Sequence, residues 1–363
     1  MERNVKAGRL IFTTSYKEAV EGTEFAFIAV GTPSGVDGEA DLRHVAAVAR
    51  AVAAEMTDPL IIINKSTVPV GTCDLVKAEI ERQLAQRGAD IAFGVASNPE
   101  FLCEGSAIDD FMRPDRVVLG VESERAENRL RELYRPLNLI EAPIHVTNLE
   151  SAELIKYASN AFLATKISFI NEMSQLCEKV GADVHSIAKG MGLDGRIGRK
   201  FLHAGPGYGG SCFPKDTLAL IRIAQEHGSS CRIVESVVEV NAAQKARMVS
   251  KIREALGGSE AHKTIAVLGL TFKAGTDDLR ESPAVRLGRA LLAVLDGDGR
   301  IVVRVPLDSP LEAKADECRP LDDQFPGGGG RLVHFGWLSP IRRKWQRDPT
   351  CACGNCQTYQ GLE

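Results

Sequence analysis

A cysteine follows a glycine-rich run in the second half of the chain. Residues 205–216 read Gly-Pro-Gly-Tyr-Gly-Gly-Ser-Cys-Phe-Pro-Lys-Asp, and their glycines let a backbone approach a ligand closely. Pro214 is suited to the first position of a helix, with Asp216 in its first turn. Cys212 would then lie at a helix N-terminus close to Lys215, and both features lower the pKa of a thiol. The pattern favours a nucleophilic thiol over the alternative, a buried cysteine in a glycine-rich turn.

Two further segments carry residues that could assist such a thiol. Lys156 and Asn160 are spaced i, i+4 and share one face of a predicted helix, where they could stabilise an oxyanion or form a solvated edge. Glu100 and Glu104 follow a predicted strand. Glu100 could be a general base or simply an acidic residue at a helix start.

The first part of the chain alternates short apolar runs with helical patterns. Strands are predicted over 24–30, 59–63 and 91–96, and helices over 41–55 and 74–86. This alternation is typical of an α/β fold with a parallel, doubly wound sheet. The polar loops at the carboxyl ends of such strands are expected to bind ligands.

One long helix is predicted to start near residue 149. Ile155, Phe162, Phe169 and Leu176 recur every seven residues. A helix of roughly thirty residues would be ~45 Å long. A helix of this length either crosses between domains or forms a dimer seam.

The remaining pattern predicts further helices and a second α/β unit. Helices are expected over 183–192 and 215–255, and a strand over 264–270. Beyond about residue 295 the periodicity is lost, and we predict a poorly ordered tail. Cys351, Cys353 and Cys356 could be half of a zinc site, but no second ligand pair follows, so no metal is expected.

Composition excludes several classes of function. The 44 Lys and Arg nearly balance the 48 Asp and Glu, and no basic stretch stands out before Ile341, so nucleic acid is not an expected partner. The first ten residues do not form a signal peptide, and the apolar runs are too short to span a membrane. Nine cysteines without a secretory signal indicate reduced thiols in the cytoplasm.

These segments together resemble the UDP-glucose/GDP-mannose dehydrogenase family from about residue 4 to about residue 293. The matching blocks, all in family order, are 30–33, 66–72, 97–105, 114–116, 156–162, 205–216, 269–273 and 280–284. The string that follows Cys212 resembles the UDP-glucose branch, with the GDP-mannose branch as the alternative. The resemblance implies a cytoplasmic homodimer with a partial Rossmann-like NAD domain, a central long-helix domain and a partial second Rossmann-like nucleotide domain.

The resemblance also implies a reaction. UDP-glucose would be oxidised to UDP-glucuronate in two hydride transfers, with NAD as acceptor. The aldehyde formed first would be captured by Cys212 as a thiohemiacetal, oxidised to a thioester and hydrolysed by water. Lys156 and Asn160 would support the oxyanion, and Glu100 would be the acid/base. Thr67 and Asp216 would hold the water.

Further residue roles follow from motif position alone. The residues expected to face NAD are Thr32, Thr67, Glu104, Lys215 and Arg280. Those expected to contact the nucleotide sugar are Glu100, Phe101, Leu102, Glu104, Lys156, Asn160, Arg196, Phe201, Gly205, Tyr208, Gly209 and Lys273.

The family pattern also sets expectations for domain organisation. We predict an NAD-binding domain over 1–146, a central helical and dimerisation domain over 147–256, the start of a UDP-sugar domain over 257–300, and a divergent tail over 301–363. The family's opening G-x-G-x-x-G turn does not occur before Gly31, so at least one βαβ unit is expected to be missing. The 363-residue polypeptide alone is therefore expected to have negligible turnover, and an inactive remnant that dimerises or binds a nucleotide sugar is the alternative.

Overall fold

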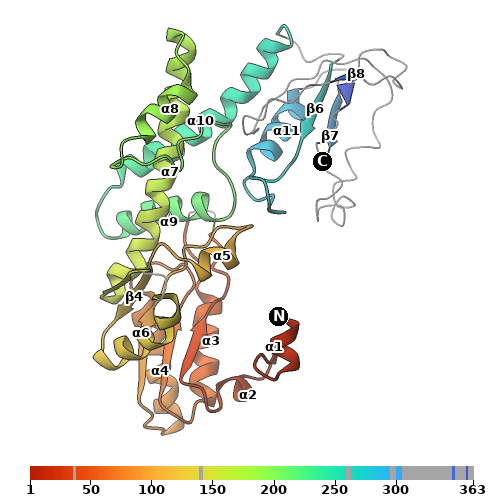
Figure 1. The fold of residues 1–363 in the computed structure, drawn as a ribbon. Helices are drawn as coiled ribbons and strands as arrows, with labels where there is room; N and C mark the ends of the chain where they lie inside the picture. Colours follow the sequence, from red (N-terminus) through yellow and green to blue (C-terminus); the bar gives the residue numbers. More distant parts are fainter. Residues whose placement is uncertain are drawn as a thin grey trace.

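The chain forms two α/β units joined by long helices (Figure 1). The structure, a computed structural model, describes residues 1–35, 38–138, 142–258, 263–294, 300–304, 346–347 and 357–358. The fold class is α/β, as the sequence predicts.

The first unit is built on a five-stranded sheet with the order β1-β2-β3-β4-β5. Its strands are β1 (Phe25–Ile28), β2 (Leu60–Asn64), β3 (Phe93–Ser97), β4 (Val117–Val121) and β5 (Ile144–Thr147). Neighbouring strands pair in parallel except for β3 and β4, which are antiparallel. The parallel arrangement predicted for the first three strands is confirmed.

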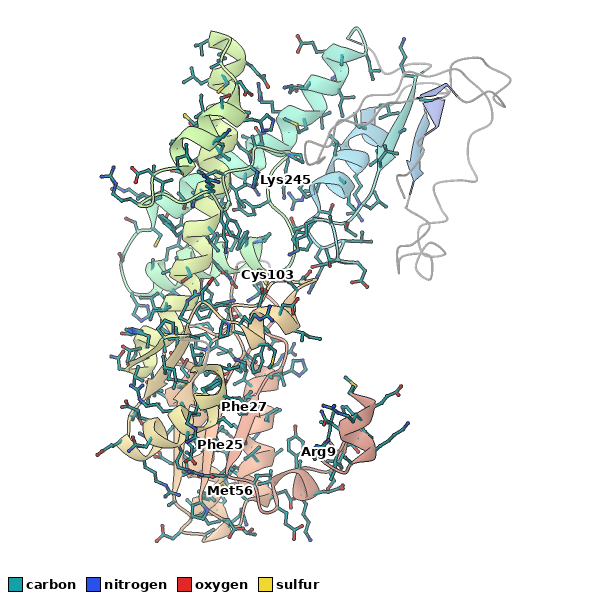
Figure 2. The ribbon with its side chains drawn as sticks, viewed as in Figure 1. Arg9, Phe25, Phe27, Met56, Cys103 and Lys245 are labelled. Atoms are coloured by element: carbon teal, nitrogen blue, oxygen red, sulfur yellow. The ribbon has the colours of Figure 1, made fainter. Side chains whose placement is uncertain are left out.

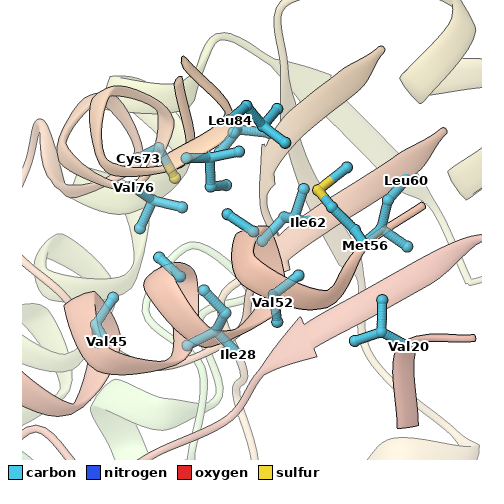
Figure 3. Close-up of a cluster of buried hydrophobic side chains, with 14 of the residues drawn as sticks. Val20, Ile28, Val45, Val52, Met56, Leu60, Ile62, Cys73, Val76 and Leu84 are labelled. Carbon is cyan, nitrogen blue, oxygen red and sulfur yellow. The ribbon is translucent and has the colours of Figure 1, made fainter. Parts of the chain in front are cut away.

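Helices cover both faces of this sheet, which explains the continuous apolar strands. All five residues of β2 are buried, and its alternate side chains enter two different cores. Ile62 packs with residues of α3 (Arg43–Glu55) and α4 (Thr72–Arg87), as Figure 3 shows. Ile63 packs on the opposite face with residues of α6 (Glu124–Asn138). The short helices α1 (Glu2–Lys6), α2 (Tyr16–Val20) and α5 (Ala107–Met112) complete the unit.

The predicted long helix is α7 (Leu149–Val180), with 32 residues. The Asn148 side chain caps its start by accepting a hydrogen bond from the Ser151 amide, 3.0 Å, and Gly181 ends it in the left-handed conformation. The helix runs from the first unit toward α8 (Val184–Gly192), as Figure 1 shows. It therefore connects the sheet to the central helices.

The helices predicted over 183–192 and 215–255 are confirmed, and the second region is divided into two helices. It consists of α9 (Cys212–Glu226) and α10 (Arg232–Ala255). Gly228 takes a positive φ of 67° directly after α9, which breaks the helix there.

The second α/β unit starts with β6 (Thr264–Leu268), close to the predicted strand. It pairs in parallel with β7 (Arg300–Arg304), and α11 (Pro283–Val294) shares a buried cluster with α10. Two short strands, β8 (Gln346–Arg347) and β9 (Gln357–Thr358), pair antiparallel. The predictions for the rest of the tail and for the three close cysteines lie outside the described residues.

Within the described residues, no helix is long and apolar enough to cross a membrane. That part of the chain also contains no cluster of His, Cys, Asp and Glu suited to a metal ion.

Candidate active site

A cavity of about 760 Å³ lies where the first unit, the central helices and the second unit meet. Cys103 is one of its lining residues, and its label in Figure 2 marks the position of the cavity. The cavity brings together segments far apart in the sequence. The predicted site residues that line it are Glu100, Phe101, Leu102, Glu104, Lys156, Asn160, Phe201, Gly209, Cys212 and Lys273.

Cys212 is the first residue of α9, with Ser211 at the N-cap position. Pro214 is therefore the third helical residue rather than the first, and Asp216 lies beyond the first turn, contrary to the prediction. Gly209 and Gly210 let the loop approach the second unit closely. A Cβ on Gly209 would lie 2.4 Å from the Glu281 carbonyl oxygen.

The predicted low pKa of Cys212 is wrong. Burial raises the pKa of the Cys212 thiol, and the charges of Asp216 and Glu100 act in the same direction. The Ser211 hydroxyl, 3.7 Å from the sulfur, and the Lys156 ammonium lower it. Lys215 points elsewhere, because its Nζ lies 2.8 Å from Asp216 Oδ1.

This environment makes a prediction about alkylation. Because the pKa of Cys212 is raised, the thiolate fraction should climb about tenfold for each pH increase of 1 from pH 7 upward. Iodoacetamide labelling with peptide mapping between pH 7 and pH 9 measures this rise at Cys212. A rate already constant near pH 7 would contradict it, and preferential labelling of Cys177 or Cys231 would argue against Cys212 as the reactive thiol.

Lys156 forms a buried ion pair with Glu100. Lys156 Nζ lies 3.1 Å from Glu100 Oε1, and its side chain is 4% exposed. Glu100 Oε2 accepts a hydrogen bond from the Leu102 amide, 2.6 Å. The Phe101 ring is close to two cations, since the Lys156 ammonium is 5.3 Å and the Arg116 guanidinium carbon 3.6 Å from its centre. These contacts fix the turn after β3 against α7.

The position of α7 is set by contacts one turn before Lys156. The Glu153 carboxylate accepts hydrogen bonds from the amides of Gly71, 2.7 Å, and Cys73, 2.9 Å, at the start of α4. Gly120 of β4 leaves room for the helix, because a Cβ there would lie 2.6 Å from the Ala152 Cβ. Lys156 is thereby held at the carboxyl edge of the sheet.

Asn160 joins the cavity to a second buried carboxylate. Its Nδ2 donates to Asp216 Oδ2, 2.5 Å, and Asp216 is 1% exposed. The other oxygen, Oδ1, is paired by charge with Lys215 but receives no hydrogen bond of good geometry. Asp216 therefore has an acceptor left for a water molecule.

Glu104 links the cysteine loop to the second unit. Its Oε1 accepts hydrogen bonds from the Ser211 hydroxyl, 3.2 Å, and from Arg280, 3.4 Å. Its Oε2 accepts one from the Thr276 hydroxyl, 3.3 Å. The loop that carries Glu100 and Glu104 thus contacts both of the other parts of the site.

Several predicted residues do not line the cavity. Gly205 and Tyr208 anchor the glycine loop: the Gly205 amide donates to Asn171 Oδ1, 2.7 Å, and the Tyr208 amide to Asn241 Oδ1, 2.8 Å. Arg196 is exposed and pairs with Asp194.

Five more predicted residues lie at the margins of the site. The Thr32 hydroxyl donates to the Thr67 carbonyl, 2.8 Å, which joins the loops after β1 and β2. Lys215 and Asp216 lie behind Asn160, and Arg280 lies beside Glu104. Thr32, Thr67, Lys215, Asp216 and Arg280 are all absent from the cavity lining.

Comparison with known proteins identifies the chain. The model of the "UDP-glucose/GDP-mannose dehydrogenase family, NAD binding domain" matches residues 1–138, and that of the same family's central domain matches residues 150–243. The chain belongs to the UDP-glucose/GDP-mannose dehydrogenase family. The resemblance stated from its motifs is confirmed.

Relatives within this dehydrogenase family cover most of the chain. It is 55% identical over 291 residues to a UDP-glucose 6-dehydrogenase of Rhizobium meliloti, which is 79% of this chain and 66% of that protein. It is 49% identical over 307 residues to UDP-glucose 6-dehydrogenase YwqF of Bacillus subtilis, which is 85% of this chain and 68% of that protein. The chain thus spans about two thirds of the length of these curated relatives.

Solved structures of the family share the fold. A UDP-glucose dehydrogenase from Pyrobaculum islandicum matches with a TM-score of 0.79 at 42% identity, over 92% of this chain and 73% of that chain. A GDP-mannose dehydrogenase from Pseudomonas aeruginosa matches with a TM-score of 0.51 at 32% identity, over 88% of this chain and 73% of that chain.

The sequence analysis did not identify some of the polar residues that line the cavity. Lys65 and Asn98 line it: Lys65 directly precedes the 66–72 block, and Asn98 lies within the 97–105 block, where the sequence analysis singled out other residues. Arg116 also lines it, from the 114–116 block. The available signal was their position at the carboxyl ends of β2 and β3 and the start of β4, where ligands bind in such folds.

Proposed function

We propose that the chain is part of an NAD-dependent UDP-glucose 6-dehydrogenase, an oxidoreductase acting on an alcohol group. The observation that carries this proposal is the single cavity that holds the Cys212 thiol, the Lys156 ammonium and Asn160 together. A thiol beside an ammonium and an amide donor suits covalent capture of an aldehyde and support of its oxyanion. The names of the relatives at 49–55% identity support the choice of substrate.

The proposed reaction uses residues of the cavity lining together with Asp216 and Thr67 at its margins. Loss of a hydride and a proton from the C6 alcohol gives an aldehyde, and Cys212 adds to it to form a C–S bond. Loss of a second hydride and proton gives a thioester. Water then attacks the thioester carbon, the C–S bond breaks, and UDP-glucuronate and the free thiol result. Lys156 and Asn160 stabilise the oxyanions, and Glu100 moves the proton of the attacking water, which Asp216 and Thr67 hold.

The charge of the cavity supports a substrate with a diphosphate. Seven basic and four acidic side chains line it, so positive charge is in excess. The basic residues are Lys65, Arg113, Arg116, Lys156, Lys166, Lys200 and Lys273. We further propose that Glu104, Phe101, Leu102, Phe201, Gly209 and Lys273 contact the nucleotide sugar.

The loops after β1 and β2 fit NAD, whose role when bound is to accept the hydride. They lie at the carboxyl ends of parallel strands, and a Cβ on Gly31 would meet no atom within 4 Å, which leaves room for a ligand. Thr32 and Thr67 would hold the cofactor from these loops, with Glu104 and Arg280 facing it from the other side of the site. The family match over residues 1–138 supports the same cofactor.

The substrate proposal predicts selective binding and turnover. Because the cavity holds the reacting groups together, we propose measurable turnover in place of the negligible turnover expected from the sequence. UDP-glucose should raise the melting temperature of the purified chain and, with saturating NAD, yield two NADH for each molecule oxidised. Thermal unfolding with UDP-glucose and with GDP-mannose, followed by absorbance of NADH, measures both. If only GDP-mannose raised the melting temperature, the substrate would be GDP-mannose rather than UDP-glucose. Binding of UDP-glucose without NADH production would favour an inactive remnant.

We also propose a homodimer formed through α7. Phe162, Phe169 and Leu176 recur every seven residues, and they are 65%, 43% and 53% exposed. Such an apolar stripe is suited to a second copy of the same helix. Light scattering at tens of micromolar should give twice the mass of the chain, and Phe169→Lys should lower it. A well-folded monomer would contradict the dimer.

Two further proposals concern organisation and location. The domain division at residues 146/147 and 256/257 is supported to within a few residues, because β5 ends at Thr147 and α10 ends at Ala255. A cytoplasmic location is supported by the free thiols of Cys73, Cys103, Cys177, Cys212 and Cys231.

A further inference from the structure

Lys65 lines the cavity but has no part in the proposed reaction. It follows β2 directly, and its Nζ donates to Asn98 Oδ1, 3.1 Å, and to the Asn98 carbonyl oxygen, 3.5 Å. A lysine so placed at a ligand-binding edge of a sheet is costly to bury, since its charge loses contact with water. The groups that Lys65 contacts must offset this cost, and they indicate the role of Lys65 in the site.

Asn98 connects Lys65 to the strands around it. Asn98 is 2% exposed, and its Oδ1 also accepts a hydrogen bond from the Tyr134 hydroxyl of α6. Its Nδ2 donates to the Val118 carbonyl of β4, 2.9 Å, and its amide to the Asn64 carbonyl of β2, 2.9 Å. Every polar atom of the Asn98 side chain is thus paired, and the turn that carries Glu100 two residues later starts from a fixed point.

The charges around Lys65 belong to the catalytic groups. The pKa of Lys65 is lowered to about 8, chiefly by burial and also by the Lys156 ammonium of α7, whereas the Glu100 carboxylate acts to raise it. Lys156 pairs directly with the Glu100 carboxylate, and the Lys65 ammonium acts on the same carboxylate through its charge. When both are protonated, one positive charge is left over, and an anion at Cys212 would balance it.

We propose that Lys65 is a positioning residue of this site, which fixes the Glu100 turn through Asn98 and offsets the Glu100 charge, so that Lys156, although paired with Glu100, can also stabilise the anion at Cys212. This inference rests on the proposed function only for its effect on turnover. Its effect on the Cys212 thiol can be measured without substrate.

The charge and the hydrogen bond can be separated by substitution. Lys65→Gln removes the charge but can still donate to Asn98, Lys65→Met removes both, and Lys65→Arg keeps a charge. Lys77→Met is the matched control, because Lys77 pairs with Glu122 on the surface, 2.8 Å, outside the cavity lining. Each variant is alkylated with iodoacetamide from pH 7 to pH 10, with peptide mapping at Cys212, and is assayed for NADH production.

Without the Lys65 charge, the Glu100 carboxylate is less offset and disfavours the thiolate more strongly. In Lys65→Gln and Lys65→Met, alkylation of Cys212 should be about tenfold slower near pH 7, where Lys65 carries its charge, and the difference should disappear above pH 9, because the pKa of Lys65 is about 8. Lys65→Arg should match the wild type near pH 7. Turnover should fall in the Lys65→Gln and Lys65→Met variants but not in Lys65→Arg. Lys77→Met should match the wild type in both measurements.

The outcomes separate this inference from the proposed function. Wild-type alkylation profiles in both Gln and Met would overturn the role of Lys65, as would a loss of turnover in Arg equal to that in Met. If the Lys65→Met variant does not fold, the test rests on Lys65→Gln, because the glutamine can still donate a hydrogen bond to Asn98. If the wild type makes no NADH but the alkylation profiles shift as expected, the charge role stands and the proposed reaction fails.

Discussion

Cys212→Ala should lower the kcat for UDP-glucose oxidation by at least about a thousandfold. In the proposed reaction the thiol forms the only covalent bond between protein and substrate, and no neighbouring group can replace it. Cys103, the other cysteine of the cavity lining, lies in a different loop beside Asp110, whose charge raises its pKa together with burial. NADH production at saturating NAD and UDP-glucose measures the loss.

A matched cysteine variant controls for the loss of a thiol as such. Cys231 is half-buried like Cys212 but lies at the start of α10, outside the cavity lining, so Cys231→Ala should keep wild-type turnover. UDP-glucose should still raise the melting temperature of Cys212→Ala, because the basic residues of the cavity remain. Residual turnover above one tenth of the wild type would refute the covalent mechanism.

Lys156→Met should lower kcat by about a hundredfold to a thousandfold with a smaller change in KM. The side chain is 4% exposed and is the ammonium that lowers the pKa of Cys212, so its removal disfavours both the thiolate and the oxyanions formed on it. The variant also leaves Glu100 without its cation partner. Steady-state kinetics and the pH dependence of alkylation at Cys212 measure these effects.

Lys179→Met is the control on the same helix. Lys179 lies in the last turn of α7 and is exposed, so its replacement should leave kcat, KM and alkylation unchanged. Equal losses in Lys156→Met and Lys179→Met would show a general effect on α7. A wild-type kcat in the Lys156→Met variant would show that Lys156 has no role in the reaction.

The sequence by itself determined the α/β class, the parallel order of the first strands and the extent of α7. These features depend on local periodicity: buried parallel strands are continuously apolar, and a helix repeats its faces every few residues. The family followed from motifs in fixed order. The position of Cys212 at a helix N-terminus was also predictable, because a glycine-rich run before a proline is typical of a turn entering a helix.

Only the tertiary structure decided which face of α7 is buried. Phe169 and Leu176 of its apolar stripe are 43% and 53% exposed, and Phe162 is 65% exposed at the cavity, while Lys156 and Asn160 are buried at 3% and 7%. Hydrophobic patterning predicts the reverse. The buried polar residues are tolerated because Glu100 and Asp216 pair with them from other segments, and no local pattern encodes such contacts.

The pKa of Cys212 also depended on packing. A helix start and a nearby lysine predict a lowered value, but Lys215 pairs with Asp216, and burial among carboxylates raises the pKa. Lys65 was missed for the same reason, since its role depends on Asn98 and Tyr134, which lie 33 and 69 residues further along the chain. Sequence spacing shows which groups are present, whereas the balance of burial and charge that sets their chemistry arises only when distant segments meet.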